Sequence, residues 1–295
     1  MTLTLATWNL NARRDSETQV RAICEHRPDV VTFQEVTRHT SPNLESALIK
    51  HGLPNIVSSV GGASSGPRKY GLVIASRFPI EPLESEVEAL WSERILAARL
   101  RWDHDVAVVT THIPPGSSNG PGVKSSMLEA ALRAAKELSQ DLPTLISGDF
   151  NAPQEEQDSV VMTWGQRRNK QGEIVIRRTP SLVRQHLAEI AWFEDEFIDA
   201  FRTLHPTDDA FSWVLKRSAG DVPRRFDHVF VNPRLRPLTA QYDLSFLQSG
   251  LSDHAPLIVT VRLAEERFAR SEPNRANPSQ SEPNQSNPSQ SEPRV

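Results

Sequence analysis

The chain has 295 residues, of which 38% are hydrophobic, so it can bury a substantial core in one large domain or two small ones. A net charge of −4 excludes the global basic field of a general DNA-coating protein, but not a local nucleic-acid patch. Its single cysteine, Cys24, excludes an internal disulfide. No segment approaches the roughly 18 apolar residues of a membrane span. Because residues 1–8 also lack the pattern of a signal peptide, we expect a cytoplasmic protein without a membrane span.

The first 36 residues predict two strands with a helix between them in sequence. Alternation over residues 3–10 indicates a strand that ends near Asn9, and helical spacing of apolar residues follows over residues 17–26. Residues 29–36 carry a continuous apolar run, which is typical of a strand buried on both faces. Glu35 comes at the end of this run, where a lone carboxylate is costly unless it is paired or binds a cation.

The same reasoning predicts further strands and helices along the chain. They are strands over residues 70–75, 87–100, 106–111, 144–146, 225–231 and 255–263, and helices over residues 41–51, 124–140 and 183–201. We expect a flexible loop over residues 61–67 and a loop over residues 113–122 that borders a cleft.

A basic segment follows the middle of the chain. Its cations are Arg167, Arg168, Lys170, Arg177, Arg178 and Arg184, against one acid, Glu173. Such a run is most often a solvated face, but here it is also a candidate contact for a phosphate backbone. Over residues 266–295 a ten-residue repeat rich in Pro, Asn, Ser and Gln replaces the apolar pattern, which predicts a disordered tail.

The stretch from Leu145 to Pro153 carries the most informative pattern. A short apolar strand runs into Gly148, and Asp149 and Asn151 follow two residues apart, so their side chains point to the same side of an extended chain. A carboxylate and an amide placed together suit a site for a phosphate and a divalent cation. Taken alone, the stretch favours an ordinary turn, because Asp, Asn, Gly and Pro are all turn residues.

Polar residues recur at the ends of the predicted strands. They are Asn9, Glu35, His112, Asp149, Asn151, Asp227, His228, Asp253 and His254. Each has an ordinary structural explanation, such as a turn cap or a surface charge. Strand ends that meet at one edge of a sheet can instead converge on a single site.

The order and contexts of these residues resemble the endonuclease/exonuclease/phosphatase superfamily, to which deoxyribonuclease I, abasic-site endonucleases, sphingomyelinases and deadenylases belong. The matching blocks are Trp8-Asn9-Leu10-Asn11, Gln34-Glu35-Val36, Thr111-His112-Ile113, Gly148-Asp149-Phe150-Asn151, Arg225-Phe226-Asp227-His228 and Ser252-Asp253-His254. The resemblance covers about residues 3–263. It implies an α/β fold for residues 1–265: a two-sheet β-sandwich flanked by helices, in four α/β/β/α layers like deoxyribonuclease I.

The resemblance also implies a role for each matching residue. Glu35 would be the principal Mg²⁺ ligand, with Asn9 beside it and Asp253 close by; Mn²⁺ is an alternative metal. His254 would act as general base on the attacking water, oriented by Asp227. The remaining positions are Asp149 and Asn151, which would position water, phosphate or a second metal, and His112, which would bind phosphoryl oxygens or protonate the leaving group.

Two further residues have less specific signals. Glu93 matches a glutamate that orients the histidine in the deoxyribonuclease I pattern, although a surface charge is an equal interpretation. Trp213 offers a ring on which a base could stack, or it belongs to the core. The histidine at position 112 favours the deoxyribonuclease I, sphingomyelinase and deadenylase branches over the abasic-site endonucleases, which carry a tyrosine in that block.

The expected function is Mg²⁺-dependent hydrolysis of a phosphoester by a monomer, with nucleic acid as the first candidate substrate. The alternative is a phosphodiesterase or phosphatase for a small or lipid phosphoester. An inactive binding module is a third hypothesis, which the complete set of polar residues disfavours.

Overall fold

The computed structural model describes residues 1–62, 68–115, 122–152, 166–171, 173–176, 191–216 and 221–264. Met1–Ala264 form one compact unit. Most of the loop over residues 61–67, residues 116–121 of the second loop, Arg177, Arg178, Arg184 and the tail lie outside the described residues. None of the described helices combines the length and the apolar character needed to cross a membrane.

The first sheet has six strands in the order β15-β16-β1-β2-β4-β3. Their bounds are β1 Thr2–Asn9, β2 Val30–Val36, β3 Asn55–Ser58, β4 Gly71–Ser76, β15 Leu235–Tyr242 and β16 Leu257–Leu263. β1 and β2 pair in parallel, and the other neighbours are antiparallel.

The second sheet also has six strands, in the order β11-β14-β8-β7-β6-β5. Their bounds are β5 Ile80–Leu83, β6 Ile95–Arg101, β7 Asp105–His112, β8 Thr144–Asp149, β11 Ile198–Asp199 and β14 Asp227–Val231. β7 and β8 are parallel, and the other pairs are antiparallel. Two hairpins lie apart from both sheets: β9 Gln166–Arg168 with β10 Ile174–Ile176, and β12 Trp213–Leu215 with β13 Val222–Arg224.

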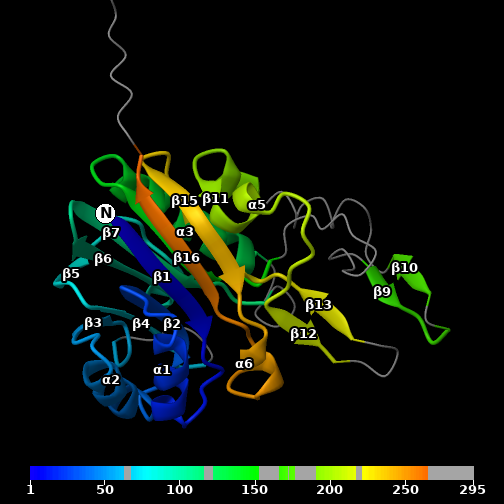
Figure 1. Cartoon of the computed structure of the whole chain (residues 1–295). Helices are drawn as coiled ribbons and strands as arrows, with labels where there is room; N and C mark the ends of the chain where they lie inside the picture. Colours follow the sequence, from blue (N-terminus) through cyan, green and yellow to red (C-terminus); the bar gives the residue numbers. More distant parts are fainter. Residues whose placement is uncertain are drawn as a thin grey trace, which may run out of the picture. The chain divides into compact units, whose positions relative to one another are not determined.

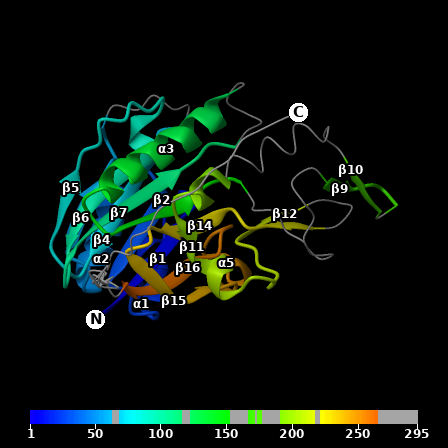
Figure 2. The same ribbon diagram turned by 90° about the horizontal axis from the view of Figure 1, so that it is seen from above.

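Helices cover the outer face of each sheet (Figures 1 and 2). The helical elements are α1 Ser16–Cys24, α2 Ser41–Lys50, α3 Val123–Ser139, α5 Ala200–Leu204, α6 Ser245–Gln248 and the 3₁₀ turn η1 Ser92–Arg94. α1 and α2 bury Val20 and Leu48 against the first sheet, where Trp8 lies. α3 buries Met127 against Ile146 of the second sheet. The expected four-layer α/β/β/α sandwich is confirmed.

The side chains between the two sheets change from apolar at one end to polar at the other. Because residues two apart share a face of a strand, the inward row of each strand can be followed along the chain. These rows are Leu3, Leu5, Thr7 and Asn9; Val30, Thr32 and Gln34; Val108, Thr110 and His112; Leu145, Ser147 and Asp149; and Val231, Val229 and Asp227. The apolar ends form the inner core, and the polar ends gather where the candidate catalytic residues lie.

Two predicted elements differ from the structure, and several short strands, such as β3 and β5, were not predicted. Residues 87–91 of the strand predicted over residues 87–100 do not form a strand; the turn η1 and then β6 follow them. The predicted helix over 183–201 lies partly outside the described residues; residues 191–194 are helical as predicted, but its last residues form β11 and the start of α5. The sequence prediction also missed β15, because Pro237 argues against a central strand; β15 lies at the sheet edge, where proline is tolerated.

Candidate active site

Asp149 lies at the centre of the polar end of the sandwich. Within the second sheet it pairs with His112 on β7 and with Asp227 on β14. Its Oδ2 accepts a 3.0 Å hydrogen bond from Asn9 of the first sheet and a 3.2 Å bond from the side chain of Asn151, whose backbone N–H donates to Oδ1 at 2.8 Å. Burial raises the pKa of Asp149 to about 7, against the opposing effect of the His254 charge.

Gly148 allows this close pairing. Its φ is 137°, and a Cβ at this position would lie 2.0 Å from the carbonyl oxygen of Thr111. Since real Cβ atoms never come so near, a side chain here would push β7 and β8 apart. The glycine before Asp149 therefore sets the distance between Asp149 and His112.

Glu35 reaches the site through a bulge in β2. The pairing of β2 with β4 shifts register between Phe33 and Val36, and Glu35 has a φ of 58°, a conformation that non-glycine residues seldom adopt. Strict alternation would turn Glu35 toward the helices with Phe33. Instead its Oε1 lies 3.4 Å from Asn9 Nδ2 and 3.6 Å from His112 Nε2, and burial raises its pKa. Strained backbone of this kind is more frequent at functional positions than elsewhere.

His254 and Asp227 form a buried pair. Asp227 Oδ2 lies 2.7 Å from His254 Nδ1, and His254 Nε2 lies 3.8 Å from Asp149 Oδ2. Although burial opposes a charged ring, the Asp227 and Asp149 carboxylates raise the pKa of His254 to about 10. Asp227 holds Nδ1, so Nε2 is the ring nitrogen that faces Asp149.

Several residues outside the predicted set hold this pair in place. Trp8 Nε1 donates to the His254 carbonyl at 2.8 Å, and Ser212 Oγ accepts from the backbone N–H of Asp227 at 3.1 Å. Tyr242 Oη donates to the Asp227 carbonyl at 2.6 Å. Trp8 and Ser212 are next to Asn9 and Trp213, which the sequence analysis selected for other reasons. No local pattern identifies Tyr242.

His112 contacts an arginine that the sequence analysis did not select. Nδ1 of the ring, which a glutamate would hold in the deoxyribonuclease I pattern, contacts Arg94 Nη1. Glu93 is 5% exposed, so its interpretation as a surface charge is wrong. Tyr70 stacks on the His112 ring at 6.2 Å with an interplanar angle of 19°. Burial, followed by the Arg94 charge, places the pKa of His112 well below its usual value.

The remaining predicted residues lie at the border of the site. Asp253 is exposed, and its Oδ2 lies 3.4 Å from Trp213 Nε1. Its negative charge contributes to the raised pKa values of Glu35 and His254. Trp213 is half-buried, stacked on Phe226 at 5.2 Å, so part of its ring is exposed and part is packed.

The donor set fits a hard divalent cation. Among the described residues, ligand atoms of Asp149, Asp227 and His254 lie within 4.8 Å of one another, and Asp227 Oδ1 is buried without a hydrogen-bond partner. Glu35 and Asp149 both face His112 Nε2, at 3.6 and 3.7 Å. Carboxylate oxygens are the protein ligands that Mg²⁺ prefers, and Glu35 and Asp149 supply them here.

The Asn9 side chain presents its amide nitrogen, and not its oxygen, to the two carboxylates. Its Oδ1 accepts a 2.9 Å bond from the backbone N–H of Asn11, a group that can only donate. The amide nitrogen must therefore face Glu35 and Asp149. In this orientation Asn9 holds the two carboxylates together.

The sequence profile of the Endonuclease/Exonuclease/phosphatase family matches residues 6–254. Comparison with curated proteins gives no match. The fold is similar to an AP endonuclease from Archaeoglobus fulgidus, with a TM-score of 0.63 and 20% identity over 87% of this chain and 98% of that one.

Two further structures of this fold were solved with DNA. The 3′ phosphatase NExo from Neisseria, bound to a product DNA hairpin, has a TM-score of 0.62 and 20% identity over 89% of this chain and 99% of that one. TDP2 from D. rerio, with a single-stranded DNA product, has a TM-score of 0.61 and 18% identity over 88% and 99%. At these identities the likeness is one of fold.

Proposed function

The chain belongs to the endonuclease/exonuclease/phosphatase family of phosphoesterases, and we propose that it is a Mg²⁺-dependent nuclease that hydrolyses phosphodiester bonds of DNA or RNA. The observation that carries this proposal is the convergence of Glu35 and Asp149 with the His254–Asp227 pair at one end of the sandwich. Mn²⁺ is an alternative to Mg²⁺.

The histidines and Asn151 supply the acid–base and hydrogen-bonding groups. His254 Nε2 accepts a proton from the attacking water, and Asp227 stabilises the ring charge that results. His112 donates a hydrogen bond to a phosphoryl oxygen as negative charge grows in the transition state. The Asn151 amide already donates to Asp149 Oδ2 and to the Ile113 carbonyl, so it orients the Asp149 carboxylate. When bound, a divalent cation would neutralise charge on the phosphoryl oxygens and offset the Asp149 charge that raises the pKa of His254.

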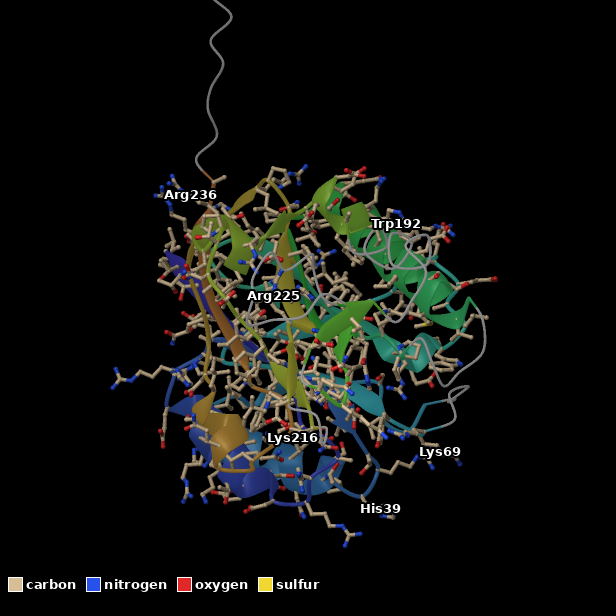
Figure 3. The ribbon with its side chains drawn as sticks, turned by 90° about the vertical axis from the view of Figure 1, so that its right-hand side faces the viewer. His39, Lys69, Trp192, Lys216, Arg225 and Arg236 are labelled. Atoms are coloured by element: carbon tan, nitrogen blue, oxygen red, sulfur yellow. The ribbon has the colours of Figure 1, made fainter. Side chains whose placement is uncertain are left out.

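Two observations support a nucleic acid as the substrate. The NExo and TDP2 structures hold DNA products. Strand β1, which ends at Asn9, ends on the side of the molecule where β12 and β13 lie (Figure 1). Figure 3 views that side and shows Lys69, His39 and Lys216 on it, and all three side chains are exposed. Lys69 and Lys216, which also pairs with Asp221, can contact a phosphate backbone although the net charge is −4.

The proposal also covers the domain organisation of the chain and the cellular location of the protein. Residues 1–265 would form the catalytic domain, because all candidate site residues lie between positions 9 and 254. Residues 266–295 would be a disordered tail, and the protein a cytoplasmic monomer.

Cleavage assays test the proposal. Wild-type protein should nick plasmid DNA or degrade labelled RNA with Mg²⁺, and EDTA should stop the reaction. Because general acid–base assistance contributes about 10²–10⁴-fold, His254→Ala should lose activity by that factor, and Asp149→Ala similarly, while circular dichroism shows a retained fold. His104→Ala, an exposed loop histidine, is the matched control and should cleave normally. Turnover of only a small phosphodiester would support the alternative substrate class, and tight DNA binding without any turnover would support a binding module.

A further inference from the structure

Arg94 lies beside His112 because of the register between β6 and β7. Ile95 pairs with Thr111, so the residue before β6 stands next to the residue after Thr111. Thr111 Oγ1 also donates a 3.0 Å hydrogen bond to the Arg94 carbonyl. Arg94 is only 4% exposed, although long cationic side chains are seldom buried without a specific partner. Its position next to the reaction centre therefore calls for a functional explanation.

The chemistry of the two groups fixes the direction of their contact. Arg94 Nη1 contacts His112 Nδ1, and a guanidinium has donors but no acceptor. Nδ1 must then be the acceptor, and the ring proton lies on Nε2. Nε2 is 3.6 Å from Glu35 Oε1 and 3.7 Å from Asp149 Oδ2, which are longer than hydrogen bonds. The Nε2–H group thus points between the two carboxylates, where a substrate oxygen would lie.

Neighbouring groups hold Arg94 and the ring in this arrangement. Arg94 Nη2 donates to the Arg68 carbonyl at 2.9 Å, and the guanidinium carbon lies 5.2 Å from the centre of the Tyr70 ring. Tyr70 in turn stacks on His112. One face of the imidazole and its Nδ1 atom are therefore both restrained.

We propose that Arg94 is a positioning residue that fixes the His112 tautomer, so that Nε2–H donates a hydrogen bond to a non-bridging phosphoryl oxygen. This inference rests on the proposed phosphodiester hydrolysis and selects one of the two roles that the sequence left open for His112. The ring keeps its proton throughout, so the departing oxygen takes its proton from solvent water.

The tautomer can be measured without any catalytic assay. In ¹⁵N NMR of histidine-labelled protein near neutral pH, the His112 signals are those that disappear in His112→Gln. Wild-type protein should show Nε2 protonated and Nδ1 unprotonated, and Arg94→Met should show a mixture of tautomers. A wild-type ring protonated on Nδ1, or on both nitrogens, would overturn the proposal. The NMR measurement does not depend on cleavage. Failure of the Arg94 proposal can therefore be distinguished from failure of the proposed nuclease activity.

Kinetics then separate a positioning role from a purely structural one. Because removing a group that orients a catalytic side chain typically costs about 10–100-fold, Arg94→Met should lower kcat by that factor with KM little changed. Arg94→Lys, which keeps a donor, should restore part of the loss. Arg99→Met changes an arginine on β6 that pairs with Glu81 and should leave kcat unchanged.

Substitutions of His112 itself keep the test decisive if Arg94→Met does not fold. The amide N–H₂ of His112→Gln can stand near the position of Nε2, so this variant should retain more activity than His112→Ala, by about tenfold for one hydrogen bond to a charged group. Equal activity of the Gln and Ala variants would show that a hydrogen-bond donor at Nε2 is not what the reaction needs. Normal kcat in a folded Arg94→Met protein would equally contradict the proposal.

Discussion

Asn9 on the first sheet donates a 3.0 Å hydrogen bond to Asp149 on the second, and its amide nitrogen also lies 3.4 Å from Glu35 Oε1. At the candidate site, one amide group thus links the two sheets and lies between two carboxylates that would otherwise repel each other. This relationship makes the catalytic geometry depend on the packing of the sandwich.

Asn9→Ala should therefore lower kcat/KM by about 10–100-fold and weaken Mg²⁺ binding, as is usual when a group that orients metal ligands is lost. Asn55→Ala removes an amide that bonds to the carbonyls of Ser76 and Arg77, away from the site, and is the matched control. Steady-state kinetics and calorimetric Mg²⁺ titration give both quantities. Unchanged values in Asn9→Ala would show that the amide does not organise the carboxylates.

Gly148→Ala should destabilise the protein and separate Asp149 from His112. The positive φ alone costs about 1–3 kcal/mol, and the contact of 2.0 Å with the Thr111 carbonyl adds to that cost. Gly52→Ala is the control, because Gly52 has a φ of 85° with nothing within 4 Å of a Cβ. Urea denaturation should show a clearly larger loss of unfolding free energy for Gly148→Ala. Equal losses in the two variants would mean that the close approach of β7 is not a constraint.

The 2.7 Å bond between His254 and Asp227 predicts strongly non-additive mutations. Residues that act as one unit lose their joint contribution when either is removed. His254→Ala combined with Asp227→Asn should therefore be little less active than His254→Ala alone. A double variant whose loss equals the product of the two single losses would indicate independent roles. The measurement is kcat for the three variants and the wild type on one substrate.

A second buried pair controls stability rather than catalysis. Both Arg225 nitrogens Nη1 and Nη2 lie 2.9 Å from Asp199 Oδ2, and both side chains are at most 3% exposed. Figure 3 shows Arg225 within the strands. Although burial opposes it, the Arg225 charge holds the pKa of Asp199 well below its usual value. Asp199→Asn should cost about 3–5 kcal/mol, because it leaves a buried arginine without its counter-charge.

The pH dependence of this effect has a defined sign. A carboxyl whose pKa is lowered by folding stabilises the protein above its unfolded pKa of about 3.9, and that stability is lost as the pH falls further. The difference in unfolding free energy between wild type and Asp199→Asn should thus be largest near neutral pH and shrink below about pH 4. Asp208→Asn, at an exposed carboxyl paired with His205, should show almost no difference at any pH. A constant difference for Asp199→Asn down to low pH would contradict the assignment.

The regular parts of the fold follow from the sequence because periodicity reports burial. Strand alternation predicts β1, and helical spacing predicts α1, α2 and α3 within one or two residues at most ends. β15 escaped prediction because a proline at a sheet edge looks like a proline outside a sheet. The turn of Glu35 into the site escaped as well, since a bulge reverses the side on which a residue points and has no local signal beyond its misplaced charge.

The sequence predicted which polar side chains converge, and their roles stay predictions; it did not predict the contacts that support them. Asp149, Asp227 and His254 come together as the motif order implies. Arg94 and Tyr242 act through pairings of strands distant in sequence, which no single segment encodes. Glu93 is an example: the sequence selected it as a partner of His112, but its neighbour Arg94 makes the contact. The register of β6 against β7, which tertiary structure fixes, determines which of the two faces His112.

The most direct test of the central claim is the Mg²⁺ dependence of plasmid cleavage by wild type beside Glu35→Gln, which removes one carboxylate charge and keeps the side-chain shape. If Glu35 and Asp149 hold the cation, wild-type cleavage saturates with Mg²⁺, stops with EDTA and recovers when Mg²⁺ is restored. Glu35→Gln should then need far more Mg²⁺ for the same rate. Cleavage that persists in EDTA, or an identical Mg²⁺ dependence in the two proteins, would contradict a metal-dependent site built on Glu35.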